Sequence, residues 1–290
     1  MQSPHPVQHH RIDVEGIATF YRQAGPADAP VLLLPHGYPC SSYAYRALMP
    51  TLSDRWRTIA PDFPGFGYSA TPDGFAYGFD GYARFLQAFV HVLGVDRYAL
   101  YLHDYGSQIG LRLAILRPDA VTGLIIQNGD IYRDALGPNY RGLLDYFDQS
   151  SDEKRAKLVG AVSMGGYREE FLNAVSAELA TQIPPDLWQL HWSLTTPRRR
   201  EIAVGLMDGL KENLEWFPRY QAYLRDHQPP TLILWGPQDG YMPEPAARAY
   251  LRDLPEAQLH LFDDGGHWLL ETHLPEVVPL IRDFLSGLPR

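Results

Sequence analysis

Short apolar runs alternate along this chain with segments of helical periodicity, and that order limits the folds open to it. Buried strands are predicted at residues 31–34, 56–60, 97–102, 121–127, 231–235 and 258–262. Helices are predicted at residues 41–52, 79–93, 106–116 and 274–288. Strands that alternate with helices form parallel sheets with right-handed crossovers. The order therefore predicts an α/β fold, with a mostly parallel central sheet flanked by helices.

The alternation stops after Asn128 and resumes near residue 231. The segment between contains helical patterns and no obvious buried strand. We therefore predict a core domain made of residues 1–128 and 229–290, and a helical cap domain made of residues 129–228. An insertion between two strands of one sheet is expected to lie over the carboxyl ends of the strands, where doubly wound sheets bind ligands.

Composition and charge exclude several classes of protein. The chain has 25 basic and 34 acidic residues, a formal net charge of −9, so we expect no nucleic acid or anionic membrane as partner. Cys40 is the single cysteine, which excludes an intrachain disulfide and a zinc–thiolate site. No cluster of side chains has metal-ligand spacing and no phosphate-loop motif is present, so no cofactor is expected. The first residues lack a signal-peptide pattern and no apolar run approaches the ~20 residues of a membrane span, so we expect a cytoplasmic location.

One segment combines strand, turn and helix without a linker. The strand predicted at residues 97–102 reaches the helix that starts at Gly106 through a turn at Asp104. A strained turn of this kind presents one side chain to the site, as in a nucleophile elbow. A carboxylate there suits displacement at a saturated carbon, which leaves an alkyl ester on the enzyme. The alternative is that Asp104 only caps the helix.

Two further side chains follow the ends of strands and can complete a catalytic set. His267 comes after a glycine pair that follows the last predicted strand, and Asp239 follows the strand before it. Asp239 can bond to one ring nitrogen of His267 and fix its tautomer. Asp130 is the alternative acid. We predict Asp104 as nucleophile, His267 as base and Asp239 as the acid that orients the base.

Backbone and ring groups near the turn supply further candidates. The N–H groups of Tyr38 and Tyr105 can form an oxyanion hole. His36 also follows a strand, and it is either a structural hydrogen-bonding residue or a substrate-binding residue.

Five sequence stretches of this chain resemble, in content and order, those of α/β-hydrolases with an aspartate nucleophile. That group contains epoxide hydrolases and haloalkane dehalogenases. The matching stretches are His36-Gly37-Tyr38-Pro39 with Ser41-Ser42-Tyr43, Pro61-Asp62 with Gly65-Phe66-Gly67-Tyr68-Ser69, His103-Asp104-Tyr105-Gly106-Ser107, Trp235-Gly236-Pro237-Gln238-Asp239, and Gly266-His267. The resemblance implies the α/β-hydrolase fold, a triad of Asp104, His267 and Asp239, a small-molecule substrate, water as second reactant and no cofactor.

The subgroup depends on the groups around the nucleophile. Dehalogenases of this group usually hold the halide with a tryptophan directly after the nucleophile and with a second donor, where this chain has Tyr105 and Tyr38. Trp192 in the cap can supply a donor. Epoxide hydrolases resemble the chain better at His-Gly-aromatic-Pro, and they use cap tyrosines to protonate the opening oxygen. Tyr167 and Tyr220 are the candidates in this cap.

The sequence therefore predicts a cofactor-independent epoxide hydrolase that acts on a hydrophobic small molecule. Haloalkane dehalogenase is the alternative. A non-catalytic ligand-binding protein on the same scaffold, and an ester or lactone hydrolase, stay open as further readings. The sequence does not determine the oligomeric state.

Overall fold

A single eight-stranded sheet organises the computed structural model, which describes residues 5–289. Its strands run in the order β1-β2-β4-β3-β5-β6-β7-β8, and β3 to β8 pair in parallel. The bounds are β1 (Gln8–Val14), β2 (Ile17–Ala24), β3 (Val31–Leu33), β4 (Arg57–Pro61), β5 (Tyr98–His103), β6 (Val121–Gln127), β7 (Thr231–Trp235) and β8 (Gln258–Leu261). The predicted α/β fold with a mostly parallel sheet is confirmed.

No element is predicted before residue 31, but the structure has a hairpin there. β1 and β2 pair antiparallel, and β2 pairs antiparallel with β4 at one end of the sheet. Glu15 and Gly16 connect the two strands with φ values of 52° and 85°. Positive φ at both central residues matches a type I′ hairpin turn, which follows the natural twist of two paired strands. β1 is polar and half exposed because it forms the edge, so it lacks the apolar run that marks a buried strand.

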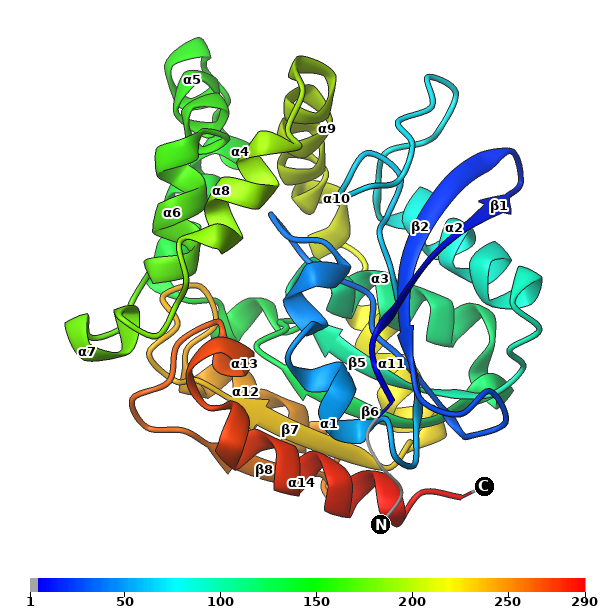
Figure 1. Ribbon diagram of the computed structural model, residues 1–290. Coiled ribbons are helices and arrows are strands. Elements are labelled where there is room, and N and C mark those ends of the chain that lie inside the picture. The colour runs from blue at the N-terminus through cyan, green and yellow to red at the C-terminus, as the bar shows by residue number, and fades with distance from the viewer. Residues whose placement is uncertain (1–4, 290) are drawn as a thin grey trace.

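Helices cover both faces of the sheet (Figure 1). One face carries α2 (Phe79–Val92), α3 (Tyr105–Leu116), α11 (Phe217–His227) and α12 (Glu244–Ala249), and the other carries α1 (Leu48–Leu52) and α14 (Leu274–Ser286). The alternation along β5 explains the two layers. Leu100 and Leu102 pack with the first group of helices, and Ala99 and Tyr101 pack with the second. Each fully buried leucine contributes about 1.5–3 kcal/mol of transfer free energy.

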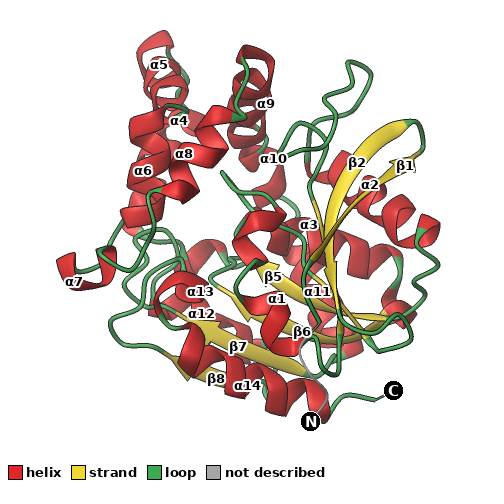
Figure 2. Cartoon of the chain, viewed as in Figure 1, coloured by secondary structure: helices red, strands yellow, loops and turns green. Residues whose placement is uncertain are grey.

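The described chain between β6 and β7 contains helices and no strand. Figure 2 shows most of them as a separate layer beyond the sheet. They are α4 (Arg141–Asp148), α5 (Asp152–Ala161), α6 (Met164–Leu172), α7 (Ala177–Ala180), α8 (Asp186–Ser193), α9 (Pro197–Asp208) and α10 (Leu210–Leu214), with 3₁₀ turns at Arg133–Ala135 and Pro138–Tyr140. We call the layer from α4 to α9 the cap.

Local capping explains why the cap helices are short and separate. The side chains of Ser151, Ser163, Ser176 and Thr196 each accept a hydrogen bond from a backbone N–H in the first turn of α5, α6, α7 and α9. A cap of this kind stabilises a helix by about 1 kcal/mol and fixes where it begins.

The last helix of the insertion belongs with the sheet. α11 packs against α3, and the Tyr220 hydroxyl accepts a hydrogen bond from Nε of Arg112 at 2.7 Å. Within the predicted insertion, 129–228, α11 therefore packs on the core, and the boundary of the cap domain at residue 228 stays a prediction. Within residues 5–289, no helix is long and apolar enough to cross a membrane.

Candidate active site

Asp104 occupies the turn between β5 and α3, with φ 51° and ψ −135°. Such a conformation is strained for a residue other than glycine, and it persists only where the surroundings enforce it. The Asp104 N–H donates to the Asn128 carbonyl, and the Asp104 carbonyl accepts from the N–H and the hydroxyl of Ser107. A Cβ atom at Gly106 would lie 2.2 Å from the Pro35 carbonyl oxygen, so glycine is required for the helix to start this close to β3.

The carboxylate of Asp104 does not cap α3. It makes no side-chain capping hydrogen bond. Instead, Oδ1 accepts a hydrogen bond of 2.6 Å from the N–H of Tyr38, in the loop after β3. A Cβ atom at Gly37 would lie 2.3 Å from the same oxygen, so the glycine lets this loop approach. The geometry therefore removes the helix-cap alternative and leaves Oδ2 facing the cavity.

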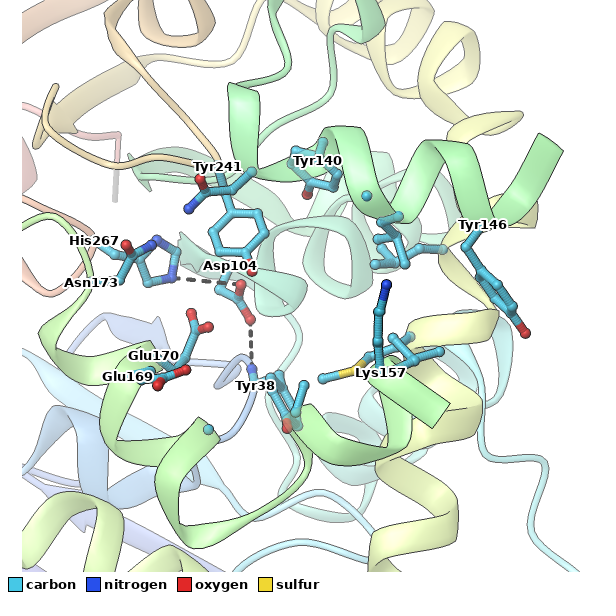
Figure 3. A pocket seen from close by; sticks show the side chains of 18 of the residues that line it. Tyr38, Asp104, Tyr140, Tyr146, Lys157, Glu169, Glu170, Asn173, Tyr241 and His267 are labelled. Atoms are coloured by element: carbon cyan, nitrogen blue, oxygen red, sulfur yellow. Dashed lines mark hydrogen bonds and ion pairs between the residues drawn. The ribbon is translucent and has the colours of Figure 1, made fainter. Parts of the chain in front are cut away.

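The structure brings together the three residues predicted as a triad. His267 Nδ1 lies 2.6 Å from Asp239 Oδ2, and His267 Nε2 lies 3.6 Å from Asp104 Oδ2. All three side chains are buried, with exposures of 6% for Asp104, 4% for His267 and 2% for Asp239. Figure 3 shows His267 and Asp104 side by side at the cavity, joined by this contact.

The electrostatics of the triad favour an ion pair in the free protein. Burial lowers the pKa of His267, but the carboxylates of Asp239 and then Asp104 outweigh it and hold that pKa well above its usual value. Burial raises the pKa of Asp239, and His267 with the N–H groups of Tyr241 and Met242 lowers it below the usual value. The two carboxylates thus favour the protonated form of His267, the predicted base.

Asp130, the alternative acid, has a different partner. Its Oδ1 accepts a hydrogen bond of 3.0 Å from Nε2 of Gln108, and burial raises its pKa to about 7. The ring nitrogen of His267 bonds to Asp239 instead. The Asp239 carboxylate is itself oriented by Nδ2 of Asn128 at 3.0 Å.

One of the two predicted oxyanion-hole donors contacts Asp104, since the Tyr38 N–H bonds to its Oδ1. Its role as an oxyanion donor stays a prediction. Tyr105 holds the first position of α3, directly after Asp104. Its N–H stays a prediction as the second donor.

A cavity of about 900 Å³ lies between the cap and the ends of the strands, and Asp104 and His267 line it. Five tyrosines line it too, and four of them, Tyr38 with Tyr105 and Tyr140 with Tyr241, form two pairs of packed rings with centroids 6.0 Å and 5.5 Å apart. Burial raises the pKa of all four phenols. They therefore remain protonated at neutral pH, with the Tyr140 hydroxyl directed to the Asp130 carboxylate and the Tyr38 hydroxyl to Tyr167.

Two of the predicted substrate-binding residues have structural partners away from this cavity. Tyr220 is fully buried between Arg112 and Asn213, so its prediction as a cap proton donor is wrong. Nε2 of His36 accepts from the N–H of Phe63 at 3.1 Å, and Nδ1 bonds to the Gly37 carbonyl, so both ring nitrogens are used. His36 supports the loop that carries Tyr38, which is the structural alternative.

The other two predicted residues lie one layer behind the cavity. Tyr167 packs edge-on against Tyr38 with centroids 5.8 Å apart, and its hydroxyl bonds to Thr195 at 3.2 Å. Trp192 packs edge-on against Tyr167 and lines a separate hollow beside α9. Both residues support the wall of the site and neither lines the cavity itself.

Comparison with known proteins assigns the chain to a family. The family model described as α/β hydrolase fold matches residues 30–274. The chain belongs to the α/β hydrolase fold family. An uncharacterized hydrolase of Saccharomyces cerevisiae is 32% identical over 284 residues, 96% of each chain. A haloalkane dehalogenase of Bradyrhizobium diazoefficiens is 41% identical over 124 residues, 43% of this chain and 40% of that one. The solved epoxide hydrolase CorEH has a TM-score of 0.77 at 20% identity and covers 97% of this chain and 99% of its own.

The hydrolase has two cavity residues that the sequence analysis does not single out. Tyr241 lies two positions after Asp239 in the same loop, outside the segment predicted as the cap. Glu170 lies in the last turn of α6 and lines the cavity beside the triad (Figure 3). Neither residue belongs to a motif, and only the placement of the cap over the sheet identifies them.

The acid of this hydrolase can be tested by exchange for an amide. Asp239→Asn is expected to lower the steady-state rate by roughly 10²- to 10⁴-fold, because the amide neither stabilises the imidazolium nor fixes the tautomer of His267. It also lowers the pKa of His267, since the carboxylate that raises it is gone. The measurement is kcat across the pH range. Asp130→Asn is the matched control, and a larger loss in that variant would transfer the role of the acid to Asp130.

Proposed function

We propose that this hydrolase opens hydrophobic epoxides through a covalent ester on Asp104. The observation that carries the proposal is that the two carboxylate oxygens of Asp104 have different surroundings. Oδ1 is held by the Tyr38 N–H, and Oδ2 faces the cavity with His267 on one side. A carboxylate oriented in this way is a nucleophile for a saturated carbon.

In the first step, Oδ2 attacks one ring carbon and the C–O bond of the epoxide breaks. The departing oxygen takes a proton from a phenol of the cavity, and Tyr140 and Tyr241 are the candidates. The products are an uncharged ester and a phenolate that regains its proton from water. Because the ester removes the charge of Asp104, the pKa of His267 falls, and its proton is released to solvent.

In the second step, the neutral His267 takes a proton from water. The hydroxide attacks Cγ of the ester, and the Tyr38 N–H donates to the oxyanion that develops on Oδ1. Collapse breaks the ester bond, and the proton left on the added oxygen passes to the departing alkoxide, which returns the carboxylate and releases a diol. Asp239 stabilises the imidazolium that forms, at the 2.6 Å contact already present.

The tyrosines favour an epoxide over a halide. A halide needs strong N–H or O–H donors but no proton, whereas an alkoxide needs a proton in the transition state. This cavity offers phenols beside the nucleophile and no tryptophan among its lining residues. The fold is shared with both classes of enzyme, so the choice between them depends on these side chains and on the test below.

The test uses two pools of compounds with the purified protein, one of hydrophobic epoxides and one of bromoalkanes. Diols from the first pool support the proposal. Bromide release from the second pool without diols from the first would replace it with haloalkane dehalogenation. Hydrolysis of a chromogenic ester alone would move the assignment to an ester or lactone hydrolase.

The role of the phenols predicts a specific loss. Tyr140→Phe and Tyr241→Phe are each expected to slow epoxide opening, and the true donor by roughly 10²-fold or more, because phenylalanine keeps the ring and removes the proton. Single-turnover rates of ring opening measure this step. Tyr146→Phe is the matched control, since Tyr146 lies at the outer part of the cavity and its hydroxyl bonds to Asp208 at 2.9 Å. Equal rates in all three variants would show that water protonates the oxygen.

A further inference from the structure

Glu170 presents a carboxylate to the triad from the cap. It lies near the C-terminal end of α6 and is partly buried. Figure 3 shows its carboxylate directed toward the space between His267 and Asp104. Across residues 5–289, no group donates a hydrogen bond to this carboxylate and no cation forms an ion pair with it.

The position of Glu170 is fixed by the residue that follows the base. The indole N–H of Trp268 donates to the backbone carbonyl of Glu170 at 3.1 Å. The ring of Phe171 packs on the Trp268 ring, with centroids 4.5 Å apart. The backbone at the end of α6 is therefore tied to the loop that carries His267, which keeps Glu170 next to that residue.

The surroundings of Glu170 disfavour its charge. Asp104 and Asp239 repel the negative charge, and His267 attracts it. The phenols of Tyr38, Tyr105 and Tyr241 also interact with it electrostatically. Its own helix adds the exposed Glu169 and Arg168. Burial raises the pKa of Glu170 to about 7, with repulsion from the two aspartates adding to it. The negatively charged form of Glu170 is therefore disfavoured in the free protein, and no hydrogen bond or ion pair of the described residues compensates for it.

One ring nitrogen of His267 is free to bond a further molecule. Nε2 has no hydrogen-bond partner within the described residues, since Asp104 Oδ2 is 3.6 Å away. The proposed second step requires a water at that nitrogen, in reach of Cγ of Asp104. Such a water has a second hydrogen, which needs an acceptor on the cap side of the cavity.

We propose that Glu170 is a further catalytic residue, whose carboxylate accepts a hydrogen bond from the hydrolytic water and holds it for His267. The inference rests on the proposed function. One hydrogen of the water passes to Nε2 of His267, and the other stays on oxygen and points to Glu170. The oxygen forms the new bond to Cγ, and Glu170 itself takes up no proton. The role is confined to the second step.

The test separates the two steps in single-turnover experiments on the full chain, with an epoxide that leaves a covalent adduct on the His267→Gln variant. In Glu170→Gln, the adduct is expected to form within about threefold of the wild-type rate and to decay roughly 10²-fold more slowly, because the water is no longer held in place. The adduct therefore accumulates. Glu169→Gln removes a neighbouring, exposed carboxylate and is expected to behave as wild type.

The pH profile distinguishes catalysis from a structural role. Glutamine resembles the protonated form of Glu170, so the ratio of wild-type to variant decay rates is expected to be near 1 well below pH 7 and to reach its full value well above it. A structural role predicts a ratio that does not change with pH. If Glu170→Gln fails to fold, Glu170→Asp keeps the charge at a shorter reach, and its slower decay must show the same rise of the ratio with pH.

Three outcomes overturn the inference. Normal decay of the adduct in Glu170→Gln overturns it alone and leaves the proposed function intact. Slow formation with normal decay moves Glu170 to the first step. Absence of any adduct on His267→Gln, with the variant folded, overturns the proposed function and this inference together.

Discussion

Replacement of Asp104 by alanine is expected to abolish turnover, with a fall in kcat of roughly 10⁴-fold or more. Asp104 supplies the only oxygen in the proposed mechanism that bonds to the substrate carbon. Other carboxylates line the cavity, among them Glu169 and Glu170, whereas the buried Asp239 and Asp130 are bonded to His267 and Gln108. None of them shares the position of Asp104 above the start of α3, so none can replace it.

The measurement is product formation under substrate saturation, with thermal unfolding as the check on folding. The fold is expected to tolerate the change, because removing one of several neighbouring carboxylates relieves repulsion. Ser107→Ala is the informative companion variant, since Ser107 is the nearest hydroxyl in the same turn. Hydrolysis of a chromogenic ester that survives Asp104→Ala and disappears in Ser107→Ala would overturn the aspartate mechanism.

Replacement of His267 by glutamine is expected to stop the reaction after the first step, with the ester on Asp104 still intact. The first step needs only the carboxylate of Asp104 and a proton source, so it proceeds. The second step loses its base, which costs roughly 10²- to 10⁴-fold. The ester therefore persists, and intact-protein mass spectrometry detects it. A gain equal to the whole epoxide identifies ring opening, and a gain equal to a haloalkane minus hydrogen halide identifies dehalogenation.

The double variant with Asp104→Ala is the control for this adduct, because it retains every other nucleophile of the surface. An adduct that remains in the double variant would be attached elsewhere and would contradict the mechanism. A folded His267→Gln protein that binds compounds from either pool without reacting would instead support a non-catalytic ligand-binding protein.

The core of the fold follows from local sequence because its strands are buried on both faces. β5, β6 and β7 are nearly continuous apolar runs, and the predicted bounds differ from the observed ones by at most one residue. The hairpin of β1 and β2 has no such run, since its outer strand is polar and half exposed. Its pairing is fixed by the turn at Glu15 and Gly16 and by the neighbouring β4, which are not visible as periodicity.

The residues of the site also differ in how well the sequence predicts them. Asp104, His267 and Asp239 each follow the end of a parallel strand, and such ends meet at one edge of the sheet, so their meeting could be predicted. The side chains of the cap could not be placed in this way. Which face of a short helix points inward depends on how the cap rests on the core. Tyr220 therefore proved to be a packing residue beside Arg112, and Glu170 proved to line the cavity.

The crowding of carboxylates around the nucleophile also acts before any bond is formed. Asp104 and Asp239 raise the pKa of both Asp130 and Glu170. Next to the nucleophile, these carboxylates together oppose a further negative charge. An acidic group is therefore disfavoured beside Asp104, whereas an uncharged or basic group is not. The same charges that set the protonation states of the triad thus act as a filter on the ionic character of what reaches it.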